Sequence, residues 1–580
     1  MRFAKSYLHK PFLFLYFLII YYTGDAQLFP EKNYPRSYFV YPVGAVIGLA
    51  ANFGELRPNH YHMGLDCKTD RKQNMPVYAA AEGYIAHVRI EPSGFGRAIY
   101  INHPNGLTTL YGHLNDFSPE LEKYVKEQQY KLQQWQVFLD IPPGLFPVTQ
   151  KQLIAFSGNT GGSQGPHLHF EIRDTKTDKV LNPLLFGFPI KDDVPPTILR
   201  LAIYDRCLST YSQNPRLLGL NKVNGIYTPA SQLVLLNTDK VSFGISAFDR
   251  STGSANPNGI YEAVIYNNGI AEVGFQIDSI SYDETRYLNA HIDHKLRASG
   301  GPFVEHLSRL PGYPEGVYRD FNGNGVIDIE DDSVHHIKIV VKDTYANSSV
   351  LEFNVKRGSQ NKNNNLGATG HPEKNFHPGF VNIFEKDDIQ LILSETDLYD
   401  SVAFNYAKRS PVSGLSVSDQ HVVETDMVPV HGYFTIRLKA NRSLTPDEAN
   451  RIIIQRTGGP KTDVQKPLRE GDWFTGHFRN FGNFQLLIDN TPPVITPIGI
   501  RENANLSHAS QVIFVVRDNY DEIKNFRAEL DGKWLRFTND KGRSFIYKFD
   551  EMCIPGIHEL KVSVEDEAGN TTTKSFHFTR

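Results

Sequence analysis

The chain has very few cysteines: Cys67, Cys207 and Cys553 are the only three in 580 residues. They lie far apart in the sequence, so at most one pair could form a disulfide, and none has the C-x-x-C spacing of a metal site. A disulfide framework is therefore excluded. The folded parts of the chain must be held together by their apolar cores.

The chain also lacks an excess of positive charge. Its 60 Lys and Arg face 64 Asp and Glu, for a formal net charge of −4, which argues against nucleic acid as a partner. Hydrophobic residues at 40% and charged residues at 21% are ordinary for globular material. The length allows several domains of about 100–200 residues each, and the aromatic content of 12% favours strands.

Long apolar runs are missing except at the N-terminus. Residues 11–22, "PFLFLYFLIIYY", follow a stretch with three basic residues, and small residues precede Gln27. This is the pattern of a secretory signal over residues 1–26, and its apolar core is shorter than the roughly 18–20 residues of a spanning helix. An uncleaved N-terminal membrane anchor is the alternative.

The rest of the chain reads as short strands. Residues 38–190 contain many apolar runs separated by Gly and Asn turns, as in an antiparallel β domain. One stretch differs: "SPELEKYVKEQQYKLQQWQVFLD" at 118–140 begins with a capping Ser118 followed by acidic residues and helix formers. It predicts a helical insertion.

The C-terminal two thirds repeat themselves. "HHIKIVVKDTYANSS" (335–349) aligns with "HELKVSVEDEAGNTT" (558–572), and "DDVPPTI" (192–198) aligns with "DNTPPVI" (489–495). The second copy has about 90 residues, the size of an immunoglobulin-like sandwich; the first is longer and must carry an insertion. The expected fold class is mainly β: a small antiparallel β domain with a helical insertion, followed by about three immunoglobulin-like β-sandwich domains.

These patterns divide the chain into six parts. The expected ranges are a signal peptide at 1–26, the first β domain at 27–190, an immunoglobulin-like domain with an insertion at 191–356, a polar linker at 357–375, a β domain at 376–488 and an immunoglobulin-like domain at 489–580.

The segment "GPHLHFEI" (165–172) carries the first chemical signal. On an extended strand His167, His169 and Glu171 share one face, while the apolar residues between them face the other way. Chance alone supplies about 0.8 H-x-H pairs in a chain with this histidine content, so the pair proves little by itself. It becomes specific because other segments supply a complete set: "HYHMGLD" offers His62 and Asp66, and "LYGHL" offers His113.

The order H-x-G-x-D, Y-G-H-L and S-G-N-T-G-x-S-x-G-P-H-L-H-F-E-I resembles the lysostaphin/LytM-type peptidoglycan metalloendopeptidases. The resemblance covers about residues 40–185. It implies that His62, Asp66 and His169 bind zinc and that His113 and His167 are the catalytic pair. The helical insertion departs from the family pattern and is a candidate for gating the cleft.

The chemistry agrees with what the resemblance implies. Two imidazoles and one carboxylate leave a fourth zinc position open, as in catalytic rather than structural sites. Zinc then acidifies water and polarises the scissile carbonyl, while the two further histidines serve as proton acceptor and donor. Glu171 is expected to orient an imidazole.

A second metal question arises at "DFNGNGVIDIED" (320–331). Its Asp and Asn residues fall at positions 1, 3, 5, 9 and 12 of a calcium loop, with a glycine at position 6. The last position is Asp rather than Glu, and the flanks read as strand. A hairpin turn rich in Asn and Gly explains the same letters, so calcium at 320–331 remains one of two alternatives.

The leading hypothesis is an exported zinc metalloendopeptidase, a peptidoglycan hydrolase of the periplasm or outer cell envelope. Its substrate would be the peptide stems or cross-links, and the immunoglobulin-like domains would space the enzyme or contact envelope proteins. The alternatives are a non-catalytic peptidase-like module that binds or activates another cell-wall hydrolase, and an envelope scaffold or adhesin.

Overall fold

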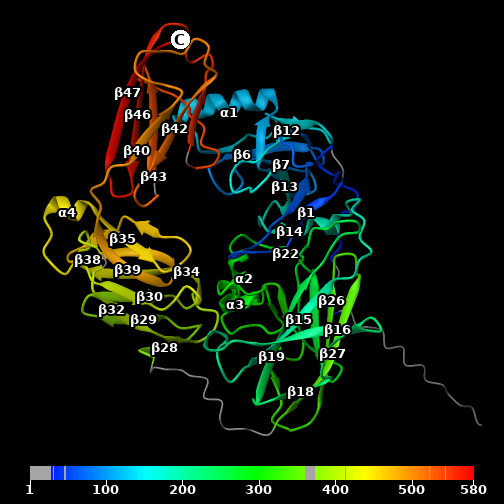
Figure 1. Ribbon diagram of the computed structural model, residues 1–580. Helices are drawn as coiled ribbons and strands as arrows, with labels where there is room; N and C mark the ends of the chain where they lie inside the picture. Colours follow the sequence, from blue (N-terminus) through cyan, green and yellow to red (C-terminus); the bar gives the residue numbers. More distant parts are fainter. Residues whose placement is uncertain are drawn as a thin grey trace, which may run out of the picture. The chain divides into compact units, whose positions relative to one another are not determined.

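The structure is a computed structural model that describes residues 28–30, 32–44, 47–358, 372–411, 413–521, 523–542 and 544–580 (Figure 1). The expected signal peptide at 1–26 and most of the expected linker at 357–375 lie outside these residues. Within the described part of the chain, no helix is both long enough and apolar enough to cross a membrane. The chain divides into the units Met1–Asn33 and Tyr34–Arg580, and the description below concerns the second.

The fold is mainly β, as the sequence predicts. The N-terminal domain is built on an antiparallel sheet whose central strands are long and apolar. In sheet order its strands are β1 (Leu49–Ala51), β4 (Leu65–Lys68), β13 (His167–Asp174), β8 (Leu107–Gly112), β7 (Arg97–Asn102), β6 (Gly83–Ile90) and β10 (Val137–Asp140), with β11 (Pro147–Val148) beside β6 and β14 (Val180–Leu181) beside β13. A second sheet contains β5 (Pro76–Tyr78), β12 (Leu153–Ser157) and β9 (Leu114–Phe117), and β2 (Leu56–Arg57) pairs with β3 (His60–Tyr61). Leu168, Phe170 and Ile172 of β13 belong to the core of this domain, which leaves the other face of the strand for polar side chains.

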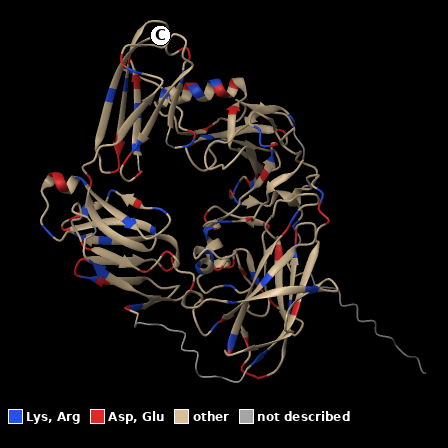
Figure 2. Ribbon diagram, in the orientation of Figure 1, with Lys and Arg blue, Asp and Glu red and all other residues tan. Residues whose placement is uncertain are grey.

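The insertion is shorter as a helix than the sequence predicts. Helix α1 spans Pro119–Leu132, with basic and acidic side chains interspersed along it (Figure 2), and it ends where Gln133 adopts a left-handed conformation. Residues 137–140 form strand β10 instead, pairing with β6, with Val137 and Leu139 buried and Phe138 exposed. At this end the chain therefore forms a strand with alternating buried and exposed residues, where the sequence predicts a helix.

The next domain is a large antiparallel assembly with two short parallel pairings. Its strands, in sheet order, are β23 (Glu305–His306), β19 (Lys240–Phe248), β15 (Thr197–Asp205), β16 (Arg216–Val223), β17 (Ile226–Pro229), β27 (Ser348–Arg357), β26 (His335–Lys342), β20 (Glu262–Asn267), β21 (Ile270–Gln276) and β24 (Tyr318–Asp320), with β18 (Leu233–Leu236) beside β27 and β25 (Ile327–Asp328) beside β19. Between β21 and β26 the chain inserts β22 (Ser279–Ile280), the 3-10 turn η3 (Thr285–Tyr287) and the short helices α2 (Leu288–His291) and α3 (His294–Ala298). Two further 3-10 turns, η1 (Pro183–Phe186) and η2 (Thr210–Ser212), lie in the connections.

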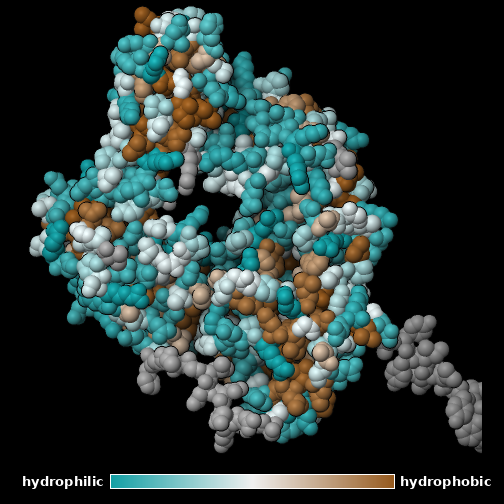
Figure 3. Space-filling view, viewed as in Figure 1, coloured by the Kyte–Doolittle hydropathy of each residue, from teal (hydrophilic) through white to brown (hydrophobic). Residues whose placement is uncertain are grey.

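The C-terminal domain repeats this connectivity without the insertion. One sheet contains β40 (Val494–Ile498), β42 (Gln511–Arg517) and β45 (Ser544–Lys548); the other contains β41 (Ala504–Asn505), β47 (Thr571–Thr579), β46 (Ile557–Asp566), β43 (Ile523–Leu530) and β44 (Lys533–Trp534). Apolar residues of both sheets form a single core. Several other apolar side chains stay exposed, among them Val494, Ile498 and Ile557, and brown surface is visible over this domain in Figure 3.

The domain between these two copies also consists of two sheets around one core, and here both sheets have five strands. The first contains β29 (Asn382–Lys386), β30 (Ile389–Leu393), β34 (Pro429–Lys439), β38 (Trp473–Asn480) and β37 (Leu468–Glu470); the second contains β32 (Tyr406–Arg409), β33 (Gln420–Val423), β39 (Gly482–Ile488), β35 (Ile452–Thr457) and β36 (Asp463–Gln465). Strands β28 (Lys374–Phe376) and β31 (Val402–Phe404) pair separately, and helix α4 spans Pro446–Asn450.

The first two domains are joined by more than a linker. Strand β22 of the second domain pairs with β14 of the first, so the N-terminal sheet continues into its neighbour. The hairpin β2–β3 is shared in the same way, because Phe53, Tyr61 and Met63 belong to the apolar core of the second domain. The segment that carries His62 therefore packs against residues that lie more than 100 positions further along the chain.

Candidate metal centre

Three neighbouring strands bring the expected site residues together. In the register of the sheet, His169 of β13 lies opposite Asp66 of β4 on one side and Gly112 of β8 on the other. His62 precedes β4 and His113 directly follows β8, so both enter the same region. The sequence alone predicts this alternation along β13, and the pairing of β13 with β4 and β8 adds the other side chains.

The connection between β3 and β4 approaches His169 very closely at Gly64. A Cβ atom at Gly64 would lie 2.5 Å from the carbonyl oxygen of Phe170 and 2.9 Å from Cε1 of His169. Such distances exclude any side chain without a shift of the strand. The glycine in H-x-G-x-D is therefore required by packing against the site.

The potential ligand atoms of His62, Asp66 and His169 converge on one point. Nε2 of His62 lies 2.9 Å from Oδ1 of Asp66 and 3.1 Å from Nδ1 of His169, and that Nδ1 lies 3.1 Å from the same carboxylate oxygen. Ligand atoms of a tetrahedral zinc site, at 2.0–2.1 Å from the metal, are about 3.3 Å apart. The three donors thus already have nearly the spacing that zinc requires, and all three residues are buried.

Outer partners fix which nitrogen of each imidazole faces this point. Nδ1 of His62 lies 2.7 Å from the carbonyl oxygen of Asn52, and Nε2 of His169 lies 2.9 Å from Oε1 of Glu171. Both partners are acceptors, so each of these nitrogens donates a proton and the opposite ring nitrogen is the one that faces Asp66. Metal-binding histidines usually donate the other ring N–H to a carbonyl or carboxylate in this way.

The carboxylate of Glu171 is itself held from two sides. Arg173 donates from Nε to Oε2 at 2.7 Å, and the hydroxyl of Tyr282 donates to Oε1 at 2.5 Å. Burial would raise the pKa of Glu171, but Arg173 and His169 lower it to about 2. Glu171 is therefore a fixed anion beneath His169, and its position agrees with the orienting role expected for it.

Without a metal ion, the electrostatics of the site favour a positive charge among these donors. Burial alone would lower the pKa of His169, but its hydrogen bonds with Asp66 and Glu171 raise it to about 9. The neighbouring histidines likewise hold the pKa of Asp66 well below its usual range, against the effect of burial. Two nitrogens and a carboxylate, with the buried anion Glu171 behind one of the imidazoles, fit a divalent cation such as zinc.

His113 and His167 lie beside this donor set. Their ring centres are 4.8 Å apart, and Nε2 of His167 lies 3.3 Å from Oδ1 of Asp66. His113 donates from Nδ1 to the carbonyl oxygen of Thr160 at 2.9 Å, which leaves its Nε2 as an acceptor. Burial, reinforced by the other histidines, lowers the pKa of His113 to about 3, so its ring is neutral.

The backbone of His113 is unusual. Its φ of +59° lies in the left-handed region, which side-chain-bearing residues seldom adopt. Its N–H donates to the carbonyl oxygen of Phe95 at 2.8 Å and holds this conformation in place. Such strain is concentrated at functional sites in proteins, and here it turns the ring toward His167.

Comparison with known proteins assigns this domain. Residues 60–130 match the family model "Peptidase family M23", and residues 373–489 match that of a "Zu5-like domain". The N-terminal β domain is an M23 peptidase family domain. The Zu5-like match falls on the region where the sequence predicts a β domain at 376–488.

The similarity to curated relatives covers only part of this chain and of each relative. Over 128 residues, 22% of this chain and 23% of the relative, the chain is 32% identical to the DD-carboxypeptidase/endopeptidase Mpg of Neisseria meningitidis. It is 26% identical over 181 residues to the peptidoglycan DD-endopeptidase ShyA of Vibrio cholerae, covering 30% of this chain and 36% of that one. A solved structure of a zinc-containing peptidase from Vibrio cholerae is 25% identical, covers 27% of this chain and 41% of the other, and has a TM-score of 0.20. The chain thus spans about a quarter of the length of the first relative.

Asn52 and Tyr282 contribute to the M23 site although sequence reasoning missed them. Asn52 acts through a backbone carbonyl, which any residue could supply, so no signal in the sequence marks it. Tyr282 reaches Glu171 from 111 positions away, and only the pairing of β14 with β22 places it there.

The carboxylates of the loop at 320–331, for which calcium is one of two alternatives, do not converge. Oδ2 of Asp320 pairs with Arg309 at 2.5 Å, and Oδ1 of Asp331 pairs with His335 at 3.0 Å. Within the described residues, the potential metal-binding groups include none from this loop. The three cysteines are free thiols, which fits the absence of a disulfide framework.

Proposed function

We propose that the chain is an exported zinc metalloendopeptidase that hydrolyses peptide bonds in the stems or cross-links of peptidoglycan. One observation supports this above all others. The donors of His62, Asp66 and His169 converge with both further histidines beside them, in a domain of a peptidase family whose relatives include a peptidoglycan endopeptidase. The substrate comes from the relatives, and the chemistry comes from the site.

In this proposal His62, Asp66 and His169 hold the metal. When bound, zinc supplies Lewis-acid chemistry: it makes water more acidic and polarises the carbonyl of the peptide bond. Asn52 and Glu171 keep the two ligand imidazoles in the required tautomers. Their hydrogen bonds also limit rotation of the rings.

His113 and His167 handle the protons and the developing charge. Nε2 of His113 is an unprotonated acceptor, because Nδ1 donates to Thr160, and it accepts the proton of the attacking water. Nδ1 of His167 donates to the carbonyl oxygen of Gly165 at 2.8 Å, which orients the ring. In its doubly protonated form, His167 would also donate from Nε2 and stabilise the negative oxygen that develops on the substrate carbonyl.

The setting of the enzyme is part of the proposal. The N-terminal apolar segment supports export, with the chain acting in the periplasm or at the outer envelope. The β domains that follow the M23 domain would contact envelope proteins or space the enzyme from the wall.

The test uses the zinc-loaded chain and purified peptidoglycan. Released fragments are analysed by mass spectrometry for new peptide ends, with a chelated sample and a His113→Ala variant alongside. His60→Ala is the matched control, because His60 lies two residues from His62 but its ring is exposed and hydrogen-bonds to the carbonyl oxygen of Pro58.

New peptide ends that disappear in the chelated and His113→Ala samples, and persist in His60→Ala, would support the proposal. Zinc-loaded protein that leaves every cross-link and stem intact would overturn it. The chain would then be better described as a peptidase-like binding module.

A further inference from the structure

A second group of convergent ligands lies outside the M23 domain. Asp192 precedes the Pro-Pro linker that leads into β15, Asp249 directly follows β19, and Asp343 directly follows β26. Carboxylate oxygens from all three lie within 4.8 Å of one another. Asp249 is 5% exposed and Asp343 is 3% exposed, so two of the three are almost fully buried.

This cluster has no partner for its charge. Within the described residues, no Lys or Arg forms an ion pair with Asp192, Asp249 or Asp343, and no donor reaches Oδ1 of Asp249 although that atom is buried. Burial, and then repulsion from Asp192 and Asp343, raise the pKa of Asp249 to about 7. An unpaired buried carboxylate beside two others is costly unless a cation joins them.

The loop around the cluster is built to hold it. Asn347 donates from its backbone N–H to Oδ1 of Asp343 at 2.9 Å and from Nδ2 to Oδ2 at 2.7 Å. The same Nδ2 also donates to the backbone carbonyl of Asp192 at 3.2 Å, and Ser349 donates to the carbonyl of Pro196 at 2.6 Å. The linker and the loop after β26 are thereby fixed against each other.

The C-terminal domain repeats the arrangement at every one of these positions. The corresponding cluster consists of Asp489, Asp518 and Asp566, whose carboxylate oxygens also lie within 4.8 Å of one another. Asn570 donates to Oδ2 of Asp566 at 2.9 Å and to the backbone carbonyl of Asp489 at 3.0 Å, as Asn347 does in the first copy. Oδ1 of Asp518, like that of Asp249, is buried with no donor among the described residues.

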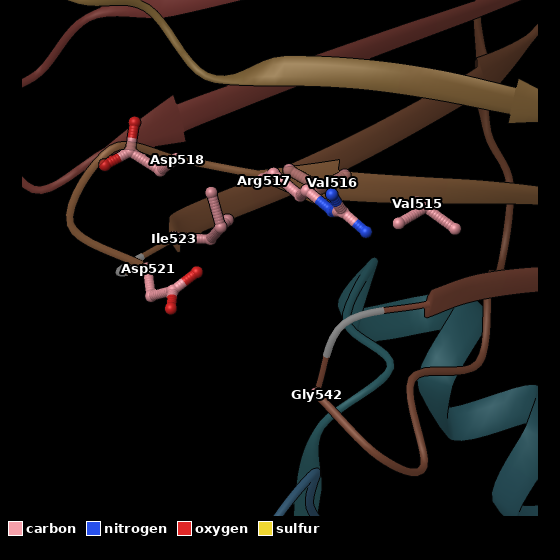
Figure 4. A pocket seen from close by; sticks show the side chains of 7 residues that line it. All are labelled: Val515, Val516, Arg517, Asp518, Asp521, Ile523 and Gly542. Carbon is pink, nitrogen blue, oxygen red and sulfur yellow. The ribbon is translucent and has the colours of Figure 1, made fainter. Parts of the chain in front are cut away.

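The two copies are similarly enclosed, because each combines two buried carboxylates with one partly buried carboxylate, Asp192 in the first and Asp518 in the second. Asp518 is half-buried at the end of β42 and also lines a pocket with Arg517, Asp521 and residues of the neighbouring strands (Figure 4). Lys466 lies close enough to Asp566 to be affected by its charge, although its Nζ donates to the carbonyl of Ala568. Lys466 therefore offsets part of the negative charge of the second cluster.

We propose that Asp192, Asp249 and Asp343 bind a calcium ion, and that Asp489, Asp518 and Asp566 form an equivalent site. All the donors are oxygens, which suits calcium or magnesium rather than zinc. Calcium accepts six to eight oxygen ligands in flexible geometry, whereas magnesium demands a near-ideal octahedron and is seldom held by protein ligands alone, so a cluster of protein carboxylates favours calcium. Each ion would join the start of its domain to the ends of two core strands.

The first measurement is the calcium content of the zinc-loaded full chain. The chain is dialysed against about 1 mM calcium, the weak end of affinities for extracellular modules, and the bound metal is counted. We expect two calcium ions per chain. Terbium provides a second readout, because Tyr345 and Tyr520 lie in the two site loops and can sensitise its luminescence.

Variants assign the ions to the sites. Asp249→Asn and Asp518→Asn keep the side-chain shape and should each remove one calcium, and the double variant should bind none. Asp331→Asn is the matched control, because Asp331 belongs to the loop at 320–331 and pairs with His335; it should retain both ions. The melting temperature is recorded with calcium and with chelator.

The two conditions separate metal binding from a purely structural role. With chelator, Asp249→Asn should melt at a higher temperature than the wild type, because it removes repulsion; with calcium, the order should reverse. A wild-type chain that binds a single calcium ion, lost in Asp249→Asn and retained in Asp518→Asn, would support the first site and overturn the second. No bound calcium, displacement by an equal concentration of magnesium, or loss in Asp331→Asn but not in Asp249→Asn would overturn the assignment.

Discussion

The hydroxyl of Tyr282 offers a sensitive test of how the neighbouring domain supports the M23 site. Tyr282→Phe removes only the oxygen that donates to Glu171 at 2.5 Å. Arg173 still holds the other carboxylate oxygen at 2.7 Å, so Glu171 stays in place but becomes a less firmly held acceptor for His169. We therefore expect weaker zinc binding by a chain that still folds.

The size of the effect follows from the bond that is lost. A hydrogen bond to a charged group contributes about 1.5–3 kcal/mol, and changes to second-shell partners cost about 10–100-fold in metal affinity or activity. Because Arg173 remains, Tyr282→Phe should fall near the lower end, at about tenfold weaker zinc affinity.

The assay is competition for zinc with a chromophoric chelator, followed by peptidoglycan digestion at saturating zinc. Tyr287→Phe is the control, since Tyr287 lies in the same inserted segment but stacks on Tyr313. A zinc affinity for Tyr282→Phe equal to that of the control would refute the argument that this hydrogen bond supports the site.

Three further predictions test the packing around the site and the second domain. A chain ending after residue 190 should aggregate or lose zinc, because the truncation removes the apolar partners of the segment that carries His62. Chromatography and metal content measure this, and a soluble, zinc-loaded and fully active fragment would contradict it. Gly64→Ala should lower stability by about 1–3 kcal/mol in denaturant titrations and reduce activity, whereas Gly165→Ala, where nothing lies within 4 Å of the new Cβ, should not. Burial lowers the pKa of His306 to about 3, so this histidine binds a proton more readily in the unfolded chain than in the folded one. The free energy of unfolding should therefore fall by about 1.4 kcal/mol per pH unit as the pH drops from about 6.5 toward 3. Melting curves of His306→Phe should lack that part of the pH dependence, and an unchanged pH profile would argue against a neutral buried His306.

Part of the candidate site could be predicted from the sequence because that part of its signal is local. The alternation of His167, His169 and Glu171 on one strand depends only on strand geometry, whereas the ligand and catalytic roles of the site residues come from the family resemblance and stay predictions. The mainly β fold follows in the same way from short apolar runs and turn residues. By contrast, the prediction that the helical insertion continues to residue 140 is wrong, because the pairing of β10 with β6 specifies a strand there.

The sequence could not predict the contacts between residues that lie far apart in the chain. Tyr282 contacts Glu171 only because two domains share a sheet. The alignment of the repeats does match Asp343 with Asp566, but Asp249 and Asp518 end strands that the repeat motif does not include. Their convergence with the other carboxylates depends on how β19 and β42 pair within their sheets.

The pairing of β14 with β22 has a consequence for protein engineering. If modules were exchanged at linkers, the boundary near residue 190 would look suitable for a cut. Here a donor M23 domain would arrive without the strand that completes its sheet edge and without the tyrosine beneath its glutamate. A successful graft must therefore carry the segment around residues 277–287 together with the M23 domain.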